Sequence, residues 1–246
     1  MKLVKKQKNH QKNSMKTIGI IVAMDLEMAL LSEKLSDVDI VEINKYKFYQ
    51  SKYENNKVIF TTSGIGKVNA SIVTTLMINF FKPDLIIHSG IAGGYQKDLK
   101  PLEIVVADKL IYSDVDMTSP ISGNFEYGRI QDLPRVFYSK KELVEELRSE
   151  ANVKVGTMIT GDQFNDSYEK VDSLVKRYFQ DDNVLSTDME SCAIAHVAYL
   201  NNVDVLVMKA ISDLIGKSNG MEYSTFAQIA ANNSANLALK LIKKIT

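Results

Sequence analysis

The chain of 246 residues has little of what several classes of protein require. Its one cysteine, Cys192, permits no internal disulfide and is typical of a protein kept in a reducing cytoplasm. Three scattered histidines and that cysteine do not form a metal-binding pattern. No apolar run approaches the ~18 residues of a membrane span. We therefore expect a cytoplasmic protein with no cofactor, no metal and no membrane association.

An excess of charge is also missing, because 30 basic and 30 acidic residues balance. Residues 1–14 (MKLVKKQKNHQKNS) hold five of the lysines and no acid, so the remainder is mildly acidic. An acidic body argues against a nucleic-acid-binding surface. The basic tip lacks the apolar core of a signal peptide, and two interpretations stay open: a disordered extension, or sequence ahead of a true start at Met15. We divide the chain into this extension, 1–14, and one domain, 15–246.

What is present is apolar sequence, at 45% of the residues, which is enough for one large core. Strand-like runs alternate with helix-like patterns, and such alternation predicts an α/β protein with a largely parallel or mixed sheet covered on both faces. The longest irregular stretch, Ser113–Pro134, is expected to be a functional or interface loop. The predicted strands are Thr17–Ala23, Lys45–Tyr53, Lys57–Thr62, Asp84–His88, Glu103–Tyr112, Lys154–Thr160, Val184–Thr187 and Val203–Ala210, and the predicted helices are Leu26–Leu35, Val68–Phe81, Glu190–Leu200 and Thr225–Ile245.

Polar and glycine-bearing segments follow six of the predicted strands. In sheets of this kind, ligands bind where the strands end. If the sheet is parallel, these segments meet at one edge, and their convergence predicts an active site. The segments are "AMDLE" (Ala23–Glu27), "TSGIGK" (Thr62–Lys67), "HSGIAGG" (His88–Gly94), "TGDQFND" (Thr160–Asp166), "STDME" (Ser186–Glu190) and "KAISD" (Lys209–Asp213).

Each segment taken alone has a simpler interpretation. "SGIGK" lacks the spacing of a phosphate-binding loop and fits a tight strand-to-helix turn. Glu27 fits an acid in the first turn of a helix, and Asp213 fits a helix cap. His196 fits a packed helix residue. No Ser-His-Asp arrangement is indicated, because His88 is expected to face apolar residues.

Taken together and in order across positions 19–213, "GIIVAMDLEM", "TSGIGKVNA", "HSGIAGG", "TGDQF", "STDMESCAIAHV" and "KAISD" resemble the methylthioadenosine/S-adenosylhomocysteine nucleosidases of the nucleoside phosphorylase superfamily. The resemblance spans Lys16 to Thr246. It implies a three-layer fold with a central mixed β-sheet flanked by helices. It also implies hydrolysis of the N-glycosidic bond of 5′-methylthioadenosine and S-adenosylhomocysteine to adenine and the 5-substituted ribose, in methionine salvage.

The resemblance assigns three acids to the reaction. Glu27 matches the general base that activates water, and Asp213 matches the general acid that protonates adenine N7, with Ser212 orienting it. Glu190 matches the acid that accepts hydrogen bonds from the ribose hydroxyls and stabilises positive charge on the sugar. Asp188 is expected to face away in a supporting role. The loop after the first strand holds Glu27 and no phosphate-binding arginine, which favours hydrolysis over phosphorolysis.

The resemblance also predicts the binding residues and the partner. Phe164 stacks on adenine, backbone groups of Asn165 bind its edge, and Gly93 lets the main chain approach the ligand. Met189 packs on the sugar. The family is a homodimer that completes the 5′ pocket across its interface, and the residues that match the lining of that pocket are Ile65, Met117 and Tyr223.

Three departures leave the preferred 5′ group open. Ile91 stands where many relatives have serine, Lys209 stands where many have arginine, and the Ser119–Asn124 loop is a few residues longer. Methylthioadenosine, S-adenosylhomocysteine, 5′-deoxyadenosine and 6-amino-6-deoxyfutalosine all stay candidates. Two other functions also stay open: a nucleoside phosphorylase and a non-catalytic nucleoside-binding protein.

Overall fold

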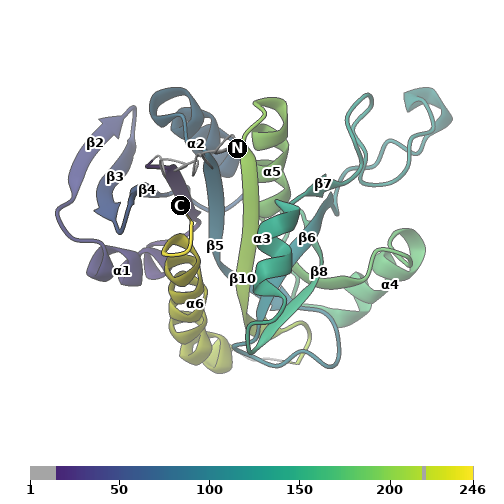
Figure 1. Cartoon of the computed structure of the whole chain (residues 1–246). Helices are drawn as coiled ribbons and strands as arrows, with labels where there is room; N and C mark the ends of the chain where they lie inside the picture. Colours follow the sequence, from purple (N-terminus) through teal and green to yellow (C-terminus); the bar gives the residue numbers. More distant parts are fainter. Residues whose placement is uncertain (1–14, 218–219, 246) are drawn as a thin grey trace, which may run out of the picture.

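The computed structural model describes residues 15–217 and 220–245, so the basic tip lies outside the described residues. A mixed β-sheet lies between layers of helices (Figure 1). The strands are β1 Thr17–Val22, β2 Asp39–Ile43, β3 Tyr46–Tyr53, β4 Asn56–Thr62, β5 Leu85–Gly94, β6 Ile104–Tyr112, β7 Phe137–Tyr138, β8 Val153–Thr160, β9 Val184–Asp188 and β10 Asp204–Leu214. The helices are α1 Asp25–Lys34, α2 Lys67–Phe81, α3 Lys141–Leu147, α4 Tyr168–Tyr178, α5 Ser191–Leu200 and α6 Gly220–Ile242, with a 3₁₀ turn at Pro120–Ser122.

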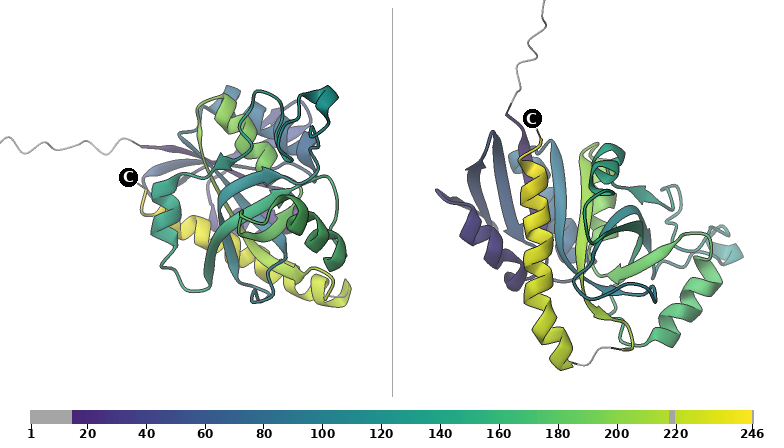
Figure 2. Two further views of the ribbon diagram at one scale, coloured as in Figure 1. Left: turned by 90° about the vertical axis from the view of Figure 1, so that its right-hand side faces the viewer. Right: turned by 60° about the horizontal axis from the view of Figure 1, so that its bottom comes forward.

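The helices form two layers because successive strand residues point to opposite faces of the sheet. On β5, Leu85 and Ile87 join the core under α1, α3 and α6, whereas Ile86 joins the core under α2 and α5. A strand buried on both faces has to be apolar at every position, which explains the continuous apolar runs. Figure 2 shows α6 lying along one face of the sheet. None of the helices among the described residues has the length and apolarity needed to cross a membrane.

Five of the strands close into a ring of pairings. β10 pairs in parallel with β5 and antiparallel with β6, β6 pairs with β8, β8 pairs with β9, and β9 returns antiparallel to β5. The strands β1, β4, β3 and β2 continue the sheet outward from β5. The predicted central mixed sheet flanked by helices is therefore confirmed, and the ring is an addition that the sequence pattern did not predict.

Two of the segments expected to follow strands lie within them instead. The glycines of "HSGIAGG" belong to β5 and "KAISD" belongs to β10, where Gly93 is opposite Asp213. These stretches stay extended because each strand supplies backbone hydrogen-bond partners to the other. The register shifts between Ile211 and Asp213, so Ser212 is the extra residue of a β-bulge. Bulges redirect side chains, which explains how the consecutive residues Ser212 and Asp213 line one cavity.

Candidate active site

All six polar segments meet at one cavity, which encloses about 580 Å³ of empty space including its open side. The expectation of convergence is met although the sheet is not uniformly parallel. β9 runs against β5, but it pairs only with the last two residues of β5, so both strands end at the cavity. Ten of the predicted site residues line it: Glu27, Ile65, Gly93, Phe164, Asn165, Met189, Glu190, Ser212, Asp213 and Tyr223.

Met117 is the exception, because it does not line the cavity of its own chain. It lies in residues 113–134, which form the teal loops at the upper right of Figure 1. The Met117 carbonyl accepts hydrogen bonds from the Phe125 N–H at 2.9 Å and from the Ser122 hydroxyl at 2.9 Å. We call residues 113–134 the excursion.

Glu27 has more contacts than a first-turn acid needs. It is buried, and its Oε2 accepts hydrogen bonds from the backbone N–H groups of Ala23 at 2.7 Å and Met24 at 2.9 Å. Its Oε1 accepts a third bond from the Ile91 N–H at 2.8 Å. The carboxylate therefore bridges the start of α1 to β5. Gly90 makes room for it, since a Cβ at that position would lie 2.2 Å from Glu27 Oε1.

Asp213 lies in a less polar environment. Burial raises the pKa of its carboxyl above the ordinary value, although a hydrogen bond from the Ser212 hydroxyl at 2.6 Å opposes that shift. A carboxyl that holds its proton to a higher pH is suited to act as a general acid. Ser212 contacts the acid directly, as expected of a residue that orients it.

Glu190 is buried at the start of α5 and is held from two sides. Its Oε1 accepts a hydrogen bond from the Gly66 N–H at 2.9 Å, and its Oε2 lies 3.5 Å from the Lys209 ammonium. Burial raises the pKa of Glu190, and the positive charge of Lys209 opposes that rise. Lys209 is itself fully buried, and its pKa is raised because the attraction of Glu190 and Asp188 outweighs the effect of burial.

Asp188 was expected to face away, but it is among the residues that line the cavity. Its carboxylate accepts hydrogen bonds from the hydroxyl of Thr160 at 2.6 Å and from the backbone N–H of Ser191 at 3.0 Å, and it lies 3.5 Å from the Lys209 ammonium. Burial alone would raise its pKa, but Lys209 and His88 outweigh burial and lower it. Lys209 therefore lies between two buried acids whose pKa values are shifted in opposite directions.

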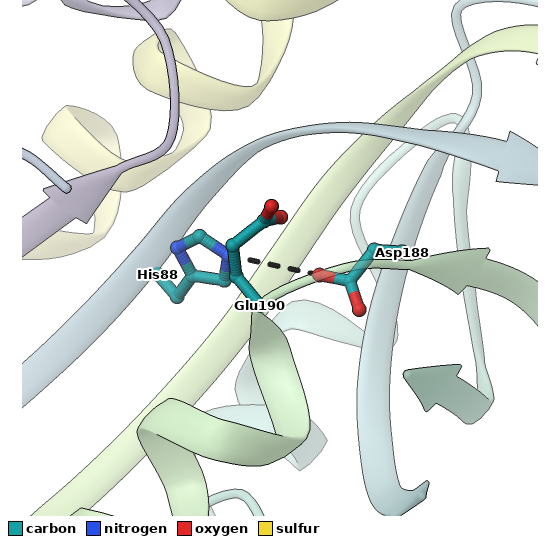
Figure 3. Close-up of side chains that lie close together, drawn as sticks. All are labelled: His88, Asp188 and Glu190. Carbon is teal, nitrogen blue, oxygen red and sulfur yellow. Dashed lines mark ion pairs between the residues drawn. The ribbon is translucent and has the colours of Figure 1, made fainter. Parts of the chain in front are cut away.

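The expectation that His88 faces apolar residues is wrong. Its Nε2 lies 3.7 Å from Asp188 Oδ2, and Figure 3 shows the Asp188 carboxyl directed at the His88 ring, with the Glu190 side chain beside that ring. The Nδ1 atom lies 2.9 Å from the Ile21 carbonyl, which can only accept, so Nδ1 carries a proton. The sequence did not predict this pairing, because β5 and β9, the strands that carry His88 and Asp188, are far apart in the sequence and become neighbours only when the ring of strands forms.

These three side chains could in principle hold a metal ion, because one ligand atom from each lies within 4.8 Å of the others. The Lys209 ammonium already lies 3.5 Å from both carboxylates, and its positive charge would repel a cation there. The arrangement is that of a buried ion cluster rather than a metal centre.

Known proteins of similar sequence and structure identify the family of this chain. The family model described as the phosphorylase superfamily matches residues 17–243. The chain belongs to the phosphorylase superfamily. A 5′-methylthioadenosine/S-adenosylhomocysteine nucleosidase of Oceanobacillus iheyensis is 35% identical over 93% of this chain and 100% of the relative, and that of Staphylococcus aureus is 36% identical over the same shares. The solved structure of the nucleosidase from Neisseria meningitidis, in complex with methylthio-immucillin-A, has a TM-score of 0.86 at 30% identity, covering 94% of this chain and 100% of that chain.

The resemblance to the nucleosidase branch of the phosphorylase superfamily is thus confirmed. Lys209 is the one basic residue among the described residues that line the cavity, and none of those residues is an arginine. The aromatic side of the cavity is open, because the Phe164 side chain is 68% exposed and meets the Tyr223 ring edge-on at 6.2 Å.

Proposed function

We propose that this chain, as a nucleosidase domain over residues 15–246, hydrolyses the N-glycosidic bond of 5′-methylthioadenosine and S-adenosylhomocysteine. The products are adenine and the 5-substituted ribose, as methionine salvage requires. One observation carries the proposal: a single cavity holds a carboxyl with a raised pKa, Asp213, and two carboxylates fixed by backbone N–H groups, Glu27 and Glu190. The relatives that carry the nucleosidase name support it.

The reaction divides among the three acids. Asp213 donates its proton to adenine N7, so that the leaving base takes the bonding electrons as a neutral molecule. Glu27 accepts a proton from the water that attacks the anomeric carbon, and its three backbone hydrogen bonds fix its direction. Glu190 accepts hydrogen bonds from the ribose hydroxyls, and its negative charge stabilises the oxocarbenium-like transition state.

The substrate is held by residues that line the same cavity. Phe164 stacks on the purine and the backbone of Asn165 binds its edge. Gly93 has no side chain, so the main chain of β5 comes close to the ligand. Met189 covers the sugar, and Ile65 and Tyr223 contribute apolar surface to the 5′ pocket.

Hydrolysis is favoured over phosphorolysis by the charges in the cavity. A phosphate ion needs cationic or N–H donors, and Lys209 already lies between Asp188 and Glu190. Glu27 is a carboxylate where a phosphate would have to bind, and it would repel that anion. Water is the better nucleophile for this site.

A homodimer completes the proposal. Val68, Ile72 and Phe80 of α2 are exposed apolar side chains, and α2 lies beside α5, which exposes Tyr199 and Leu200. Exposed apolar side chains on two neighbouring helices are suited to a two-fold interface. In such a dimer Met117 of each chain can reach the cavity of its partner. The free, buried Cys192 fits an enzyme of the cytoplasm.

The first experiment follows adenine release in phosphate-free buffer from methylthioadenosine, S-adenosylhomocysteine, 5′-deoxyadenosine and 6-amino-6-deoxyfutalosine. We expect turnover of methylthioadenosine that a chelator does not reduce. A strict requirement for phosphate, with the correspondingly 5-substituted ribose 1-phosphate as the product, would contradict the proposal. Light scattering at micromolar concentration tests the dimer, and a fully active monomer would exclude it.

The second experiment separates the three acids. Asp213→Asn and Glu27→Gln should lower kcat and leave the affinity for an uncleavable analogue near the wild-type value, because neither holds the ground-state substrate. Glu190→Gln should weaken affinity as well as rate, since it contacts the ribose in both states. Near-normal turnover by Asp213→Asn would show that its role is assigned wrongly.

A further inference from the structure

The proposed reaction leaves Lys67 without a role, although it ends the segment "TSGIGK". Its Nζ lies 2.7 Å and 2.6 Å from the two carboxylate oxygens of Asp114 and 3.8 Å from Asp162 Oδ2. Asp114 lies at the start of the excursion, and Asp162 lies in the loop after β8. One ammonium group therefore joins three segments that are far apart in the sequence.

The backbone of the same turn holds two acids. The Gly66 N–H donates to Glu190 Oε1 at 2.9 Å, and the next N–H, that of Lys67, donates to Asp162 Oδ1 at 2.8 Å. Both groups stand at the start of α2, where the helix dipole favours negative charge. The φ angle of Gly66 is +98°, a conformation that favours glycine. The turn thus fixes the ribose-binding acid and the loop after β8 relative to each other.

The loop after β8, residues 161–165, is anchored at its first residue, where the Gly161 N–H donates to the Asp188 carbonyl at 3.2 Å. Further along the loop, Phe164 is 68% exposed, so packing of its ring does little to position the residues that follow Gly161. The Asp162 backbone N–H donates to Asp114 Oδ2 at 2.9 Å, which closes a triangle of Lys67, Asp114 and Asp162. We call residues 161–165 the purine loop, because Phe164 and Asn165 are the residues proposed to hold adenine.

We propose that Lys67 is a positioning residue that sets the place of the purine loop against Glu190 and ties both to the excursion. The identity of the bound base in this inference rests on the proposed function. Lys67 does not touch the reacting atoms, and it acts through Asp162 and Asp114. Its loss should let the purine loop move, which weakens binding of the base more than it slows the chemical step.

The test uses the full chain and three variants. Lys67→Met removes the ammonium, and Lys67→Arg keeps a cation that can reach both carboxylates. The matched control is Lys140→Met, which removes the ion pair of Lys140 with Asp204 at a place away from the cavity. Hydrogen exchange of the amides of residues 161–165 reports on the loop without any ligand. Calorimetry with adenine and steady-state kinetics with methylthioadenosine report on binding and turnover.

In Lys67→Met we expect faster exchange in the purine loop and a rise of about 10-fold in both KM and the adenine dissociation constant, because binding of the base then has to order the loop, and such ordering lowers the affinity. The fall in kcat should be smaller. Lys67→Arg should recover most of the affinity, and Lys140→Met should leave KM within about twofold of wild type, as expected for an exposed ion pair.

Three results would overturn the inference: unchanged exchange at residues 161–165 in Lys67→Met, unchanged KM and adenine affinity despite faster exchange, or an equal loss in Lys140→Met. If Lys67→Met does not fold, Asp162→Asn provides the same comparison, because it weakens the acceptor of the Lys67 N–H and keeps the side-chain shape. If the wild type neither cleaves the nucleoside nor binds adenine, the proposed function fails, while the exchange data still decide whether Lys67 positions the loop.

Discussion

Lys209 offers the sharpest test of the buried ion cluster. Its ammonium lies 3.5 Å from Asp188 Oδ2 and 3.5 Å from Glu190 Oε2, with both acids and the lysine buried. Lys209→Met keeps the length and apolar stem of the side chain and removes only the charge. The variant therefore leaves two carboxyl groups in the interior without the ammonium group, and His88 is the remaining ion-pair partner of Asp188.

The size of the effect follows from that geometry. Two unit charges 3.5 Å apart attract by about 5 kcal/mol at an effective dielectric constant of ~20. The pair of Lys209 with Asp188 sets the size of the effect, because the pKa of Asp188 is lowered. Removal of one partner from a buried pair costs about 3–5 kcal/mol. We expect the free energy of unfolding to fall by about 3–5 kcal/mol, a large share of the ~5–15 kcal/mol of a typical domain.

The loss should also depend on pH. In the wild type, Lys209 and His88 lower the pKa of Asp188, so this group stabilises the fold above its ordinary pKa and the contribution disappears as the pH falls. In Lys209→Met, burial dominates and the pKa of Asp188 rises above the unfolded value. The folded variant then binds more protons than the unfolded chain, and its stability falls as the pH rises through that window. The variant should therefore be less destabilised at about pH 5 than at about pH 8.

Urea unfolding at about pH 5 and about pH 8 measures the free energy of unfolding of Lys209→Met and its dependence on pH. Lys209→Arg is the control that preserves the charge. Without Lys209, Glu190 also holds its proton more tightly, and it then stabilises a cationic transition state less well. The loss of a charge-assisted hydrogen bond, about 1.5–3 kcal/mol, corresponds to a fall of about 10- to 100-fold in kcat/KM. A stability loss below about 1 kcal/mol that does not change with pH would refute the ion-cluster reasoning.

Three further predictions concern Asp213 and Glu27, the two carboxyls proposed to be catalytic. Since only protonated Asp213 can act as the acid and burial raises its pKa, wild-type kcat/KM should fall as the pH rises above that pKa; Asp213→Asn should lose about 10²–10⁴-fold in rate and show no such fall. The Ser212 hydroxyl lowers the pKa of Asp213, so Ser212→Ala should move the fall in the pH–rate profile to higher pH. Gly90→Ala would place a methyl group 2.2 Å from Glu27 Oε1 at a φ of +155°, so kinetics should show a loss of kcat and urea unfolding a loss of about 1–3 kcal/mol.

The sequence predicted the parts of the fold that depend on local pattern. The strand predicted at Thr17–Ala23 is observed as β1, Thr17–Val22, and the helix predicted at Val68–Phe81 is observed as α2, Lys67–Phe81. These segments show clear β-branched runs or helical periodicity. Such patterns reflect burial on both faces of a strand or on one face of a helix, and both can be read without knowing the partner.

The helix α4 was not predicted although its pattern is clear: it is amphipathic, Val171 and Val175 are buried one turn apart, and Ser167 caps its start. Two other elements that were not predicted, β2 and α3, have weaker patterns. β2 buries one residue, Ile43, and α3 buries Val144 and Leu147. Their stability depends on packing against distant strands. Their pattern of polar and apolar residues alone is too sparse to indicate a helix or strand.

The candidate site was likewise predicted only in part. The chemistry of strand-end acids and glycines was enough to predict which segments converge. It did not predict the β-bulge at Ser212, the pairing of His88 with Asp188 or the contacts of Lys67 with Asp114 and Asp162. Each of these depends on register between strands or loops that are distant in the sequence, and register is set by the closed ring rather than by local sequence.

The ring of strands also bears on how the protein is made. β10 pairs with both β5 and β6 to close the ring, and it carries Lys209, Ser212 and Asp213. β10 is synthesised after all the strands with which it pairs, and α6, which carries Tyr223, is synthesised after β10. A nascent chain that lacks β10 would therefore expose the unpaired edges of β5 and β6, which favour association with other chains. Keeping the nascent chain from associating with other chains until β10 has been synthesised should therefore raise the yield of active enzyme. Termination of translation before residue 204 should yield aggregated, inactive protein.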